Sequence, residues 1–217
     1  MRIDQNSYGS VAIAWMVGGV LIILFRLLFS NPVTFWILAG LTIAVCLWQT
    51  FFFRVPLRGC PGSGSVVTAV ADGKIVINEQ VYEPLFLKRD CIQVSIYMDF
   101  FDVHANFWPA DGVVTDCKYY PGKHLLAFKP KASEENEHSC TVIRTDSGKE
   151  MMFKQLAGTF ARRIVSYSKP GLRTKAGEQC GIIKFGSRID MFFPLDADIK
   201  VKKGERVRAC ESVIALL

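Results

Sequence analysis

The residues of this chain whose types and spacing are most suggestive of chemistry are Gly186 and Ser187, within the stretch Lys184–Asp190. A serine hydroxyl that follows a glycine can attack the carbonyl carbon of the peptide bond before it. The chain is then cut, and the serine becomes a pyruvoyl group at the new N-terminus, an electron sink made from the protein itself. A glycine–serine pair is also common in turns, so the pair alone leaves both interpretations open.

Two other residues are of types that move protons. Asp72 lies between Ala71 and Gly73, so it is either a general base or a turn residue of an Asp-Gly hairpin. His104 has the side chain whose ordinary pKa lies nearest neutrality, and its alternative role is that of a polar residue at a strand end. The other histidines, His124 and His138, lie in no comparable motif.

The elements that must position these residues are predicted to be mainly strands, because short apolar alternations separated by turn residues follow Pro56. One segment, 156–165, has Leu156, Phe160 and Ile164 at helical spacing and is predicted to be a helix. We therefore expect a mainly β domain with few helices, built as a closed or partly closed sheet. The predicted strands are 66–70, 74–77, 91–97, 112–118, 124–128, 140–144, 150–153, 181–185, 188–193 and 206–217.

The last segment, Val201–Leu217, has a spacing of valine, glycine, glutamate and alanine that resembles one half of a lipoyl or biotinyl hybrid barrel. Those carriers hold their cofactor on a lysine at the tip of a hairpin. This segment lacks the corresponding Met-Lys tripeptide. The resemblance therefore supports a hybrid-barrel-like architecture and no carrier role.

Two apolar runs precede the β domain, at residues 11–29 and 33–53. Each can cross a hydrocarbon core of about 30 Å as a helix, and tryptophan and phenylalanine near their ends suit interfacial anchors. A cleaved signal peptide is the alternative for the first run, but that run lacks a strongly basic start and a small-residue cleavage site. We therefore divide the chain into an α-helical membrane hairpin, residues 1–55, and a globular domain, residues 56–217.

The charges and cysteines indicate where the globular domain lies. Arg2, Arg54 and Arg58 flank the hairpin, and its linker carries no charge, so the positive-inside rule places both ends on the cytoplasmic side of the cell (inner) membrane. The net charge of +6 suits anionic lipid, and no Lys/Arg-rich helix or RNA-binding signature favours nucleic acid. The seven cysteines show no CxxC spacing, which predicts neither a zinc site nor a disulfide framework.

Five stretches, in chain order, resemble the phosphatidylserine decarboxylases in their short prokaryotic form with a membrane hairpin. They are Val70–Ile75, Phe101–Gly112, Glu134–Glu137, Gln155–Val165 and Phe185–Arg188. The resemblance implies a proenzyme that cuts itself between Gly186 and Ser187. The products would be a β chain, residues 1–186, and an α chain, residues 187–217, which stay associated.

The same resemblance implies the reaction and the roles of its residues. The pyruvoyl group from Ser187, with no metal, would form a Schiff base with phosphatidylserine in the membrane and decarboxylate it to phosphatidylethanolamine. Asp72 corresponds to an aspartate of the self-cleavage machinery, acting as base or as orienter of a histidine. His104 corresponds to the histidine that protonates the carbanion. Larger family members carry a second histidine where this chain has Phe107, so we expect His104 to serve in both cleavage and protonation.

Several alternatives stay open from the sequence. Arg188 either binds the phosphate or carboxylate of the substrate or lies on a solvated strand. An archaetidylserine decarboxylase would share the headgroup chemistry and differ only in the lipid linkage. A membrane-anchored hybrid-barrel binding module would need no catalysis. The sequence is compatible with a homo-oligomer and does not require one.

Overall fold

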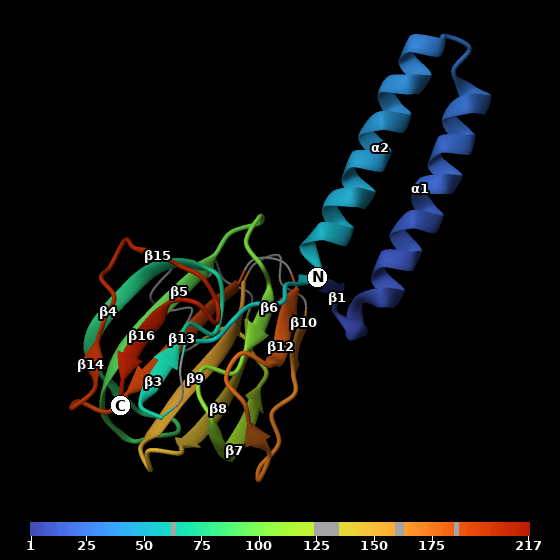
Figure 1. Ribbon diagram of the computed structural model, residues 1–217. Helices are drawn as coiled ribbons and strands as arrows, with labels where there is room; N and C mark the ends of the chain where they lie inside the picture. Colours follow the sequence, from blue (N-terminus) through green and yellow to red (C-terminus); the bar gives the residue numbers. More distant parts are fainter. Residues whose placement is uncertain (62–63, 124–134, 159–162, 185–186) are drawn as a thin grey trace. The chain divides into compact units, whose positions relative to one another are not determined.

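The computed structural model describes residues 1–61, 64–123, 135–158, 163–184 and 187–217. They form two compact units, Met1–Pro56 and Leu57–Leu217 (Figure 1). The first unit is helical and the second is made of strands. The prediction of a mainly β domain preceded by an α-helical hairpin is therefore confirmed.

The helical unit contains two helices of equal length joined by a short turn. The second helix begins sharply because the Asn31 side chain accepts a hydrogen bond from the Val33 N–H at 2.9 Å and Pro32 occupies the first helical position. The elements of this unit are β1 (Arg2–Ile3), a 3-10 turn (Gln5–Ser7), α1 (Tyr8–Leu28), α2 (Pro32–Phe52) and β2 (Arg54–Val55), with β1 paired to β2.

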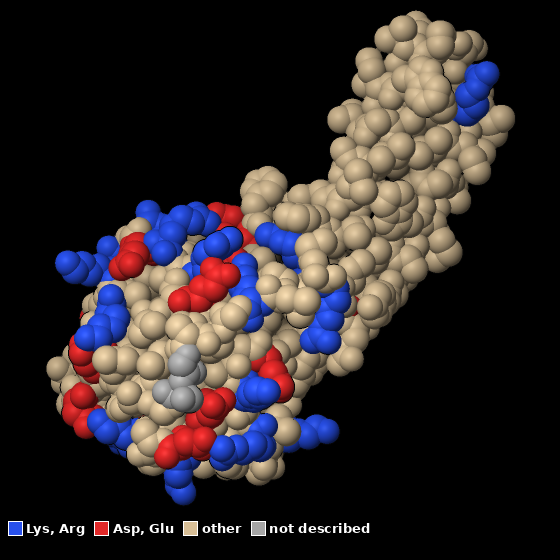
Figure 2. Space-filling view, viewed as in Figure 1, with Lys and Arg blue, Asp and Glu red and all other residues tan. Residues whose placement is uncertain are grey.

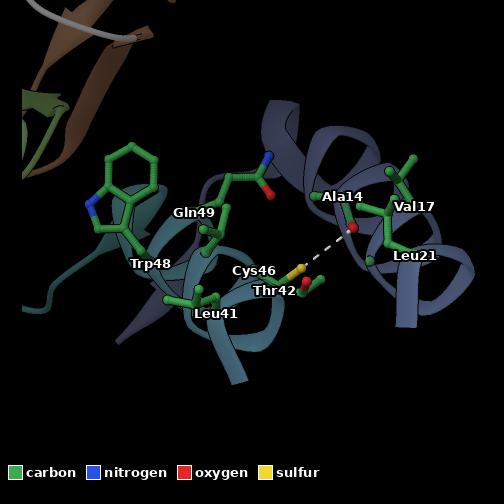
Figure 3. A pocket seen from close by; sticks show the side chains of 10 residues that line it. Ala14, Val17, Leu21, Leu41, Thr42, Cys46, Trp48 and Gln49 are labelled. Atoms are coloured by element: carbon green, nitrogen blue, oxygen red, sulfur yellow. Dashed lines mark hydrogen bonds between the residues drawn. The ribbon is translucent and has the colours of Figure 1, made fainter. Parts of the chain in front are cut away.

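Small and polar side chains line the contact between α1 and α2. A Cβ atom at Gly18 would lie 2.8 Å from Cys46 Sγ, so a glycine allows the helices to approach closely here. The Cys46 thiol donates to the Ala14 carbonyl oxygen at 3.5 Å, as Figure 3 shows. Gln49 Nε2 donates to a carbonyl oxygen of α1 at 3.2 Å. These contacts tie the two helices into one hairpin.

The outer surface of the hairpin is apolar. Both helices are long and apolar enough to cross a membrane, and large side chains such as Leu27 and Trp36 are 76% and 70% exposed. On the face drawn in Figure 2, charged side chains cover the β unit and are nearly absent from the helices. An exposed apolar surface of this extent is suited to lipid.

The β unit is built around an eight-stranded antiparallel sheet in the order β11-β7-β8-β9-β13-β5-β4-β15, which curls across Figure 1. Two three-stranded sheets, β10-β12-β6 and β14-β16-β3, complete the strands that the structure describes. The bounds are β3 (Val66–Thr68), β4 (Gly73–Glu83), β5 (Arg89–Met98), β6 (Ala105–Phe107), β7 (Gly112–Tyr120), β8 (His138–Thr145), β9 (Glu150–Ala157), β10 (Arg163–Ser166), β11 (Arg173–Thr174), β12 (Gln179–Lys184), β13 (Ser187–Phe193), β14 (Asp198–Ile199), β15 (Arg206–Val207) and β16 (Val213–Leu216).

One face of the large sheet carries the main apolar core. Ile75, Ile96 and Ile189 lie opposite one another on β4, β5 and β13, and each is at most 1% exposed. Because successive side chains of a strand alternate between faces, Ser187 points to this same face, and Arg188 points to the other. The register of β13 therefore fixes the direction of the candidate nucleophile.

Three predictions about elements are wrong. Segment 156–165 is not a helix: its first residues end β9 and its last residues lie in β10, while 159–162 are outside the described residues. Apolar residues at every fourth position fit a strand as well as a helix, since four is a multiple of two. Segment 206–217 is two strands joined by a turn, and Asp72-Gly73 is no hairpin turn because β3 and β4 lie in different sheets. The predicted strand 124–128 lies outside the described residues.

Candidate active site

Ser187 opens strand β13 in the middle of the large sheet. Its Cα partners are Met98 of β5 on one side and Ala157 of β9 on the other. The side chain is fully buried, and its hydroxyl donates to the Met98 sulfur at 3.7 Å. A thioether is a weak acceptor, so this contact orients the hydroxyl without binding it strongly. Gly186, the predicted residue before the cut, lies outside the described residues.

His104 lies just before β6, in the connection from β5. Its ring Nδ1 is 3.0 Å from the Asp102 carbonyl oxygen, so the neutral ring carries its proton on Nδ1, and Nε2 is the basic nitrogen. The His104 carbonyl oxygen accepts a hydrogen bond from the Ile183 N–H at 3.2 Å. Since Ile183 belongs to β12, the strand that precedes Ser187 in the chain, His104 lies beside the segment that leads to the predicted cut.

Asp72 lies immediately before β4 and is held by an arginine. Arg58 donates to both carboxylate oxygens, with a distance of 2.8 Å from Nη2 to Oδ2, and the Ala209 N–H donates to Oδ1 at 2.8 Å. The Asp72 hydrogen bond raises the pKa of Arg58 although burial opposes the charge. The side chains of Arg58 and Asp72 are 8% and 11% exposed. Arg58, counted above as a charge flanking the membrane, is therefore part of this site.

The starts of β4 and β13 lie at the same end of the large sheet. Lys74 and Arg188 share Tyr97 of β5 as their Cα partner, so the two strands flank β5 at the same height. Neighbouring strands are about 4.8 Å apart, which separates the backbone at Asp72 from that at Ser187 by roughly 10 Å. The stretches that carry Asp72 and Ser187 are thus neighbours in space.

The stretch that carries His104 lies against the one that carries Asp72. The Phe107 N–H of β6 donates to the Val70 carbonyl oxygen at 2.9 Å. The three stretches that carry Asp72, His104 and Ser187 therefore meet at one end of the β unit. The Phe107 side chain is 2% exposed and apolar, so it offers no proton acceptor at the position of a second histidine.

Asp102 adds a second carboxylate, which the sequence analysis did not single out. It accepts hydrogen bonds from the Asp99 N–H at 3.0 Å and from Arg206 Nη2 at 2.6 Å. Burial raises the pKa of Asp102 above its ordinary value, and the negative charges of Asp99 and Asp72 add to the effect. Asp72 and Asp102 therefore share one electrostatic environment beside His104.

Two buried carboxamides, which the sequence analysis did not single out either, are linked to the Ser187 hydroxyl through the Met98 sulfur. Gln155 Nε2 of β9 donates to Asn106 Oδ1 of β6 at 2.8 Å. Asn106 Nδ2 lies 4.0 Å from the Met98 sulfur, the same atom that accepts from Ser187. Neither type titrates, so a search for proton-transfer groups misses them. The available signal was their presence in two of the five stretches quoted above.

Arg188 lies on the face of β13 opposite Ser187. Its guanidinium donates to both carboxylate oxygens of Asp190, at 2.7 and 2.9 Å, and both side chains are fully buried. The expectation of a solvated strand charge is therefore wrong. Because this pair faces away from Ser187, the geometry gives no support to a substrate-binding role either.

His138 also lies on the face of the sheet that carries Arg188. Leu156 of β9 pairs with His138 of β8 on one side and with Arg188 of β13 on the other, so all three side chains point to the same face. Its ring stacks on Tyr120, with ring centroids 4.8 Å apart, and burial lowers its pKa. His124 lies outside the described residues. Within the part of the chain that the structure describes, no group of three or more His, Cys, Asp or Glu residues could hold a metal ion.

Comparisons with known proteins agree on one family. The family model described as "Phosphatidylserine decarboxylase" matches residues 46–215. A phosphatidylserine decarboxylase proenzyme of Amoebophilus asiaticus is 46% identical over 169 residues, 78% of this chain and 75% of the relative. Proenzymes of the same name are 39% identical in Parabacteroides distasonis, over 92% of this chain and 96% of the relative, and 38% identical in Porphyromonas gingivalis, over 100% and 99%.

Proposed function

Because this chain belongs to the phosphatidylserine decarboxylase family, we propose that it is a proenzyme that cuts itself between Gly186 and Ser187 and then decarboxylates phosphatidylserine to phosphatidylethanolamine. Family membership excludes a binding module without catalysis. The observation that carries the assignment of the site is the meeting of the Ser187, His104 and Asp72 stretches at one end of the β unit.

The cut begins with the Ser187 hydroxyl. Its oxygen attacks the Gly186 carbonyl carbon and gives its proton to a base, the peptide C–N bond breaks, and the nitrogen takes up a proton, which leaves an ester. Loss of the Ser187 Cα proton then expels the Gly186 carboxylate, and water converts the remaining dehydroalanine into a pyruvoyl group and ammonia. No oxidant or metal is required by this sequence of steps.

His104 Nε2 is the base that we assign to the first step, because Nδ1 is occupied by the Asp102 carbonyl oxygen. Asp72 is a poor candidate for that step, since Arg58 and the Ala209 N–H bind its oxygens. Its charge instead favours protonation of a nearby histidine. After decarboxylation, a protonated His104 would return a proton to the carbanion carbon.

The surroundings of Ser187 fit a pyruvoyl group. The position is buried, apolar on the side of Met98 and lined by the carboxamides of Asn106 and Gln155. When present, the group would supply a carbonyl that takes the substrate amine as a Schiff base and accepts the electrons left by carbon dioxide. The chain itself excludes water there, since Ser187 and His104 are each 0% exposed.

The fold supports an α chain that stays bound after the cut. Strand β13 pairs with β5 and β9, β15 pairs with β4, and β16 pairs with β3. All four partners belong to residues 1–186. The ladder hydrogen bonds and core contacts of the 31-residue fragment therefore do not depend on the broken bond.

The hairpin would hold the enzyme at the membrane that contains its substrate. We assign the α1–α2 turn to the outer side and both ends to the cytoplasmic side, from Arg2 and Arg54. An Asn31→Cys variant in intact spheroplasts tests this. A membrane-impermeant maleimide should label it above the background of wild type. Labelling only after permeabilisation would contradict the orientation.

Activity is tested by converting labelled phosphatidylserine in membranes that contain the full chain. Wild type should form phosphatidylethanolamine, and Ser187→Ala should form none. Ser95→Ala is the matched control, because Ser95 is equally buried in β5 but points to the other face, where it accepts from Gln93. Equal product from wild type and Ser187→Ala would refute the proposal.

A further inference from the structure

The carbonyl oxygen of Gln155 is a buried acceptor without a donor among the residues that the structure describes. Gln155 is 0% exposed, and its Oε1 atom has no hydrogen-bond partner there. Native proteins rarely leave such a group unsatisfied, because a buried acceptor without a donor is destabilising. An acceptor of this kind beside a reactive residue suggests that a ligand supplies the donor.

The direction of this oxygen follows from its neighbours. Asn106 turns its amide nitrogen toward the Met98 sulfur and its oxygen toward Gln155, which places the Gln155 nitrogen on the Asn106 side. Gly181, opposite Asn106 in the sheet, leaves room for the group: a Cβ atom there would lie 2.7 Å from Gln155 Nε2. The Gln155 carboxamide is therefore fixed by its nitrogen, and its oxygen is available.

Gln155 and Ser187 point to the same face of the sheet. The Cα partner of Gln155 on β13 is Ile189, two residues after Ser187. Such diagonal neighbours have Cα atoms about 7–8 Å apart, within reach of a long side chain. Asn106 and Ser187 also share the Met98 sulfur as acceptor. The carboxamide pair thus lies on the same face of the sheet as the Ser187 side chain and close to it.

We propose that Gln155 Oε1 accepts a hydrogen bond from the amino group of the substrate headgroup, so that the Asn106–Gln155 pair forms a subsite for primary amines. This inference rests on the proposed function. A neutral acceptor suits the chemistry, since the amine must lose a proton before it can attack a carbonyl. A carboxylate in the same place would hold the amine in its charged form.

The test compares short-chain lipids with and without an amine. Dihexanoyl phosphatidylethanolamine and dihexanoyl phosphatidylmethanol are titrated by calorimetry into the processed full-length protein in detergent. Gln155→Leu should reduce the preference for the amine lipid about tenfold, the upper part of the range for losing one hydrogen bond between neutral groups. It should still cut itself, and it should raise KM for phosphatidylserine more than it lowers kcat.

The matched control is Gln93→Leu, which makes the same change at a buried glutamine on the opposite face of the sheet. Gln93→Leu should keep the lipid preference of wild type. An unchanged preference in Gln155→Leu would overturn the inference. So would an equal loss in both variants, because that result would indicate a general effect of packing.

If Gln155→Leu does not fold, Gln155→Glu tests whether the side chain at position 155 accepts a hydrogen bond from the amine. Its shape is nearly the same and it keeps an acceptor for the amine. It loses the N–H that donates to Asn106 Oδ1, but Asn106 can turn its own amide nitrogen toward the new carboxylate. Gln155→Glu should therefore retain at least the wild-type preference for the amine lipid. A loss of that preference in Gln155→Glu would overturn the subsite. The two proposals fail separately: an uncut, inactive wild type refutes the proposed function, whereas a processed, active wild type with an indifferent Gln155 refutes only the subsite.

Discussion

The Asp72 carboxylate accepts hydrogen bonds from the Arg58 guanidinium and from the Ala209 N–H. Ala209 belongs to the fragment after the predicted cut, and Arg58 also donates to its carbonyl oxygen at 3.1 Å. The ion pair therefore joins the two future chains.

Arg58→Gln should slow self-cleavage about as much as Asp72→Asn, although Arg58 lies outside the five stretches. It should also destabilise the Ser187→Ala precursor by about 3 kcal/mol, because it leaves a buried carboxylate without its partner. Urea unfolding measures the stability, and gel analysis measures the cleavage. The control is Arg173→Gln, whose exposed pair with Asp146 should contribute less than about 1 kcal/mol. Cleavage of Arg58→Gln at the wild-type rate would show that Asp72 needs no anchor.

His104→Ala should remain uncut, since it removes the base that we assign to Ser187. His138→Ala is the matched change at the histidine on the opposite face, and it should be cut like wild type. Gel electrophoresis of freshly made protein follows both. Full processing of His104→Ala would refute the dual role of this histidine and leave it only the protonation step.

Only part of the site could be predicted from the sequence, namely the residues whose side-chain type or motif indicates a role in catalysis. Ser187 was singled out because a serine after a glycine can act as a nucleophile, whereas Asp72 and His104 were singled out by the resemblance to the family's motifs. Arg58 was considered only as a charge that flanks the membrane hairpin, since nothing local in the sequence shows which arginine pairs with a buried carboxylate. Asn106 and Gln155 carry no charge, and only their contact across two sheets gives them a role.

At the scale of elements, the positions of most strands could be predicted from the alternation of apolar and polar residues. The pairing of those strands with one another could not be predicted in this way. The connection 146–149 between β8 and β9 lies between the predicted strands 140–144 and 150–153, and its Gly148 adopts a φ of +83° that suits glycine. The pairing of β13 with both β5 and β9 was not predictable, since it depends on contacts between residues far apart in the chain. That pairing decides that Ser187 faces the core.

A buried ion pair between β4 and β9, on the face of the sheet opposite Ser187, makes the stability of the fold depend on pH. Lys154 Nζ lies 2.6 Å from Glu83 Oε1, and both side chains are at most 5% exposed. Burial alone would raise the pKa of Glu83, but hydrogen bonds from Lys154 and from the Phe86 and Leu87 N–H groups outweigh it and lower the pKa. The folded state thus holds this proton less tightly than the unfolded chain does.

The ionised Glu83 carboxylate should therefore contribute fully to the free energy of unfolding above its ordinary pKa of about 4.3. That contribution should be lost as the pH falls through the lower pKa that Glu83 has in the folded state. Urea unfolding of the Ser187→Ala precursor from neutral pH to about pH 3 measures this loss. Glu83→Gln should be less stable at neutral pH and should lose less on acidification. Glu79→Gln, an exposed change on the same strand, should behave like the parent. An identical acid slope in Glu83→Gln would contradict the assignment.

At the scale of the whole molecule, the chain combines an apolar hairpin with a β unit whose last strands are held by earlier ones. The fragment 187–217 contributes strands to both the eight-stranded sheet and the β14-β16-β3 sheet. Self-cleavage just before β13 would therefore create a new N-terminus within a fold that stays intact. That new end lies where His104, Asp72 and the two carboxamides converge.

The most direct test is intact-mass spectrometry of the wild-type chain purified from membranes. The account predicts a C-terminal fragment of one seventh of the 24.3-kDa chain, about 3.5 kDa, which begins at residue 187. Its N-terminus should be blocked to sequencing and should react with a hydrazine as a carbonyl does. Ser187→Ala should yield only the full-length mass. An unmodified 217-residue chain in active wild-type membranes would contradict the account.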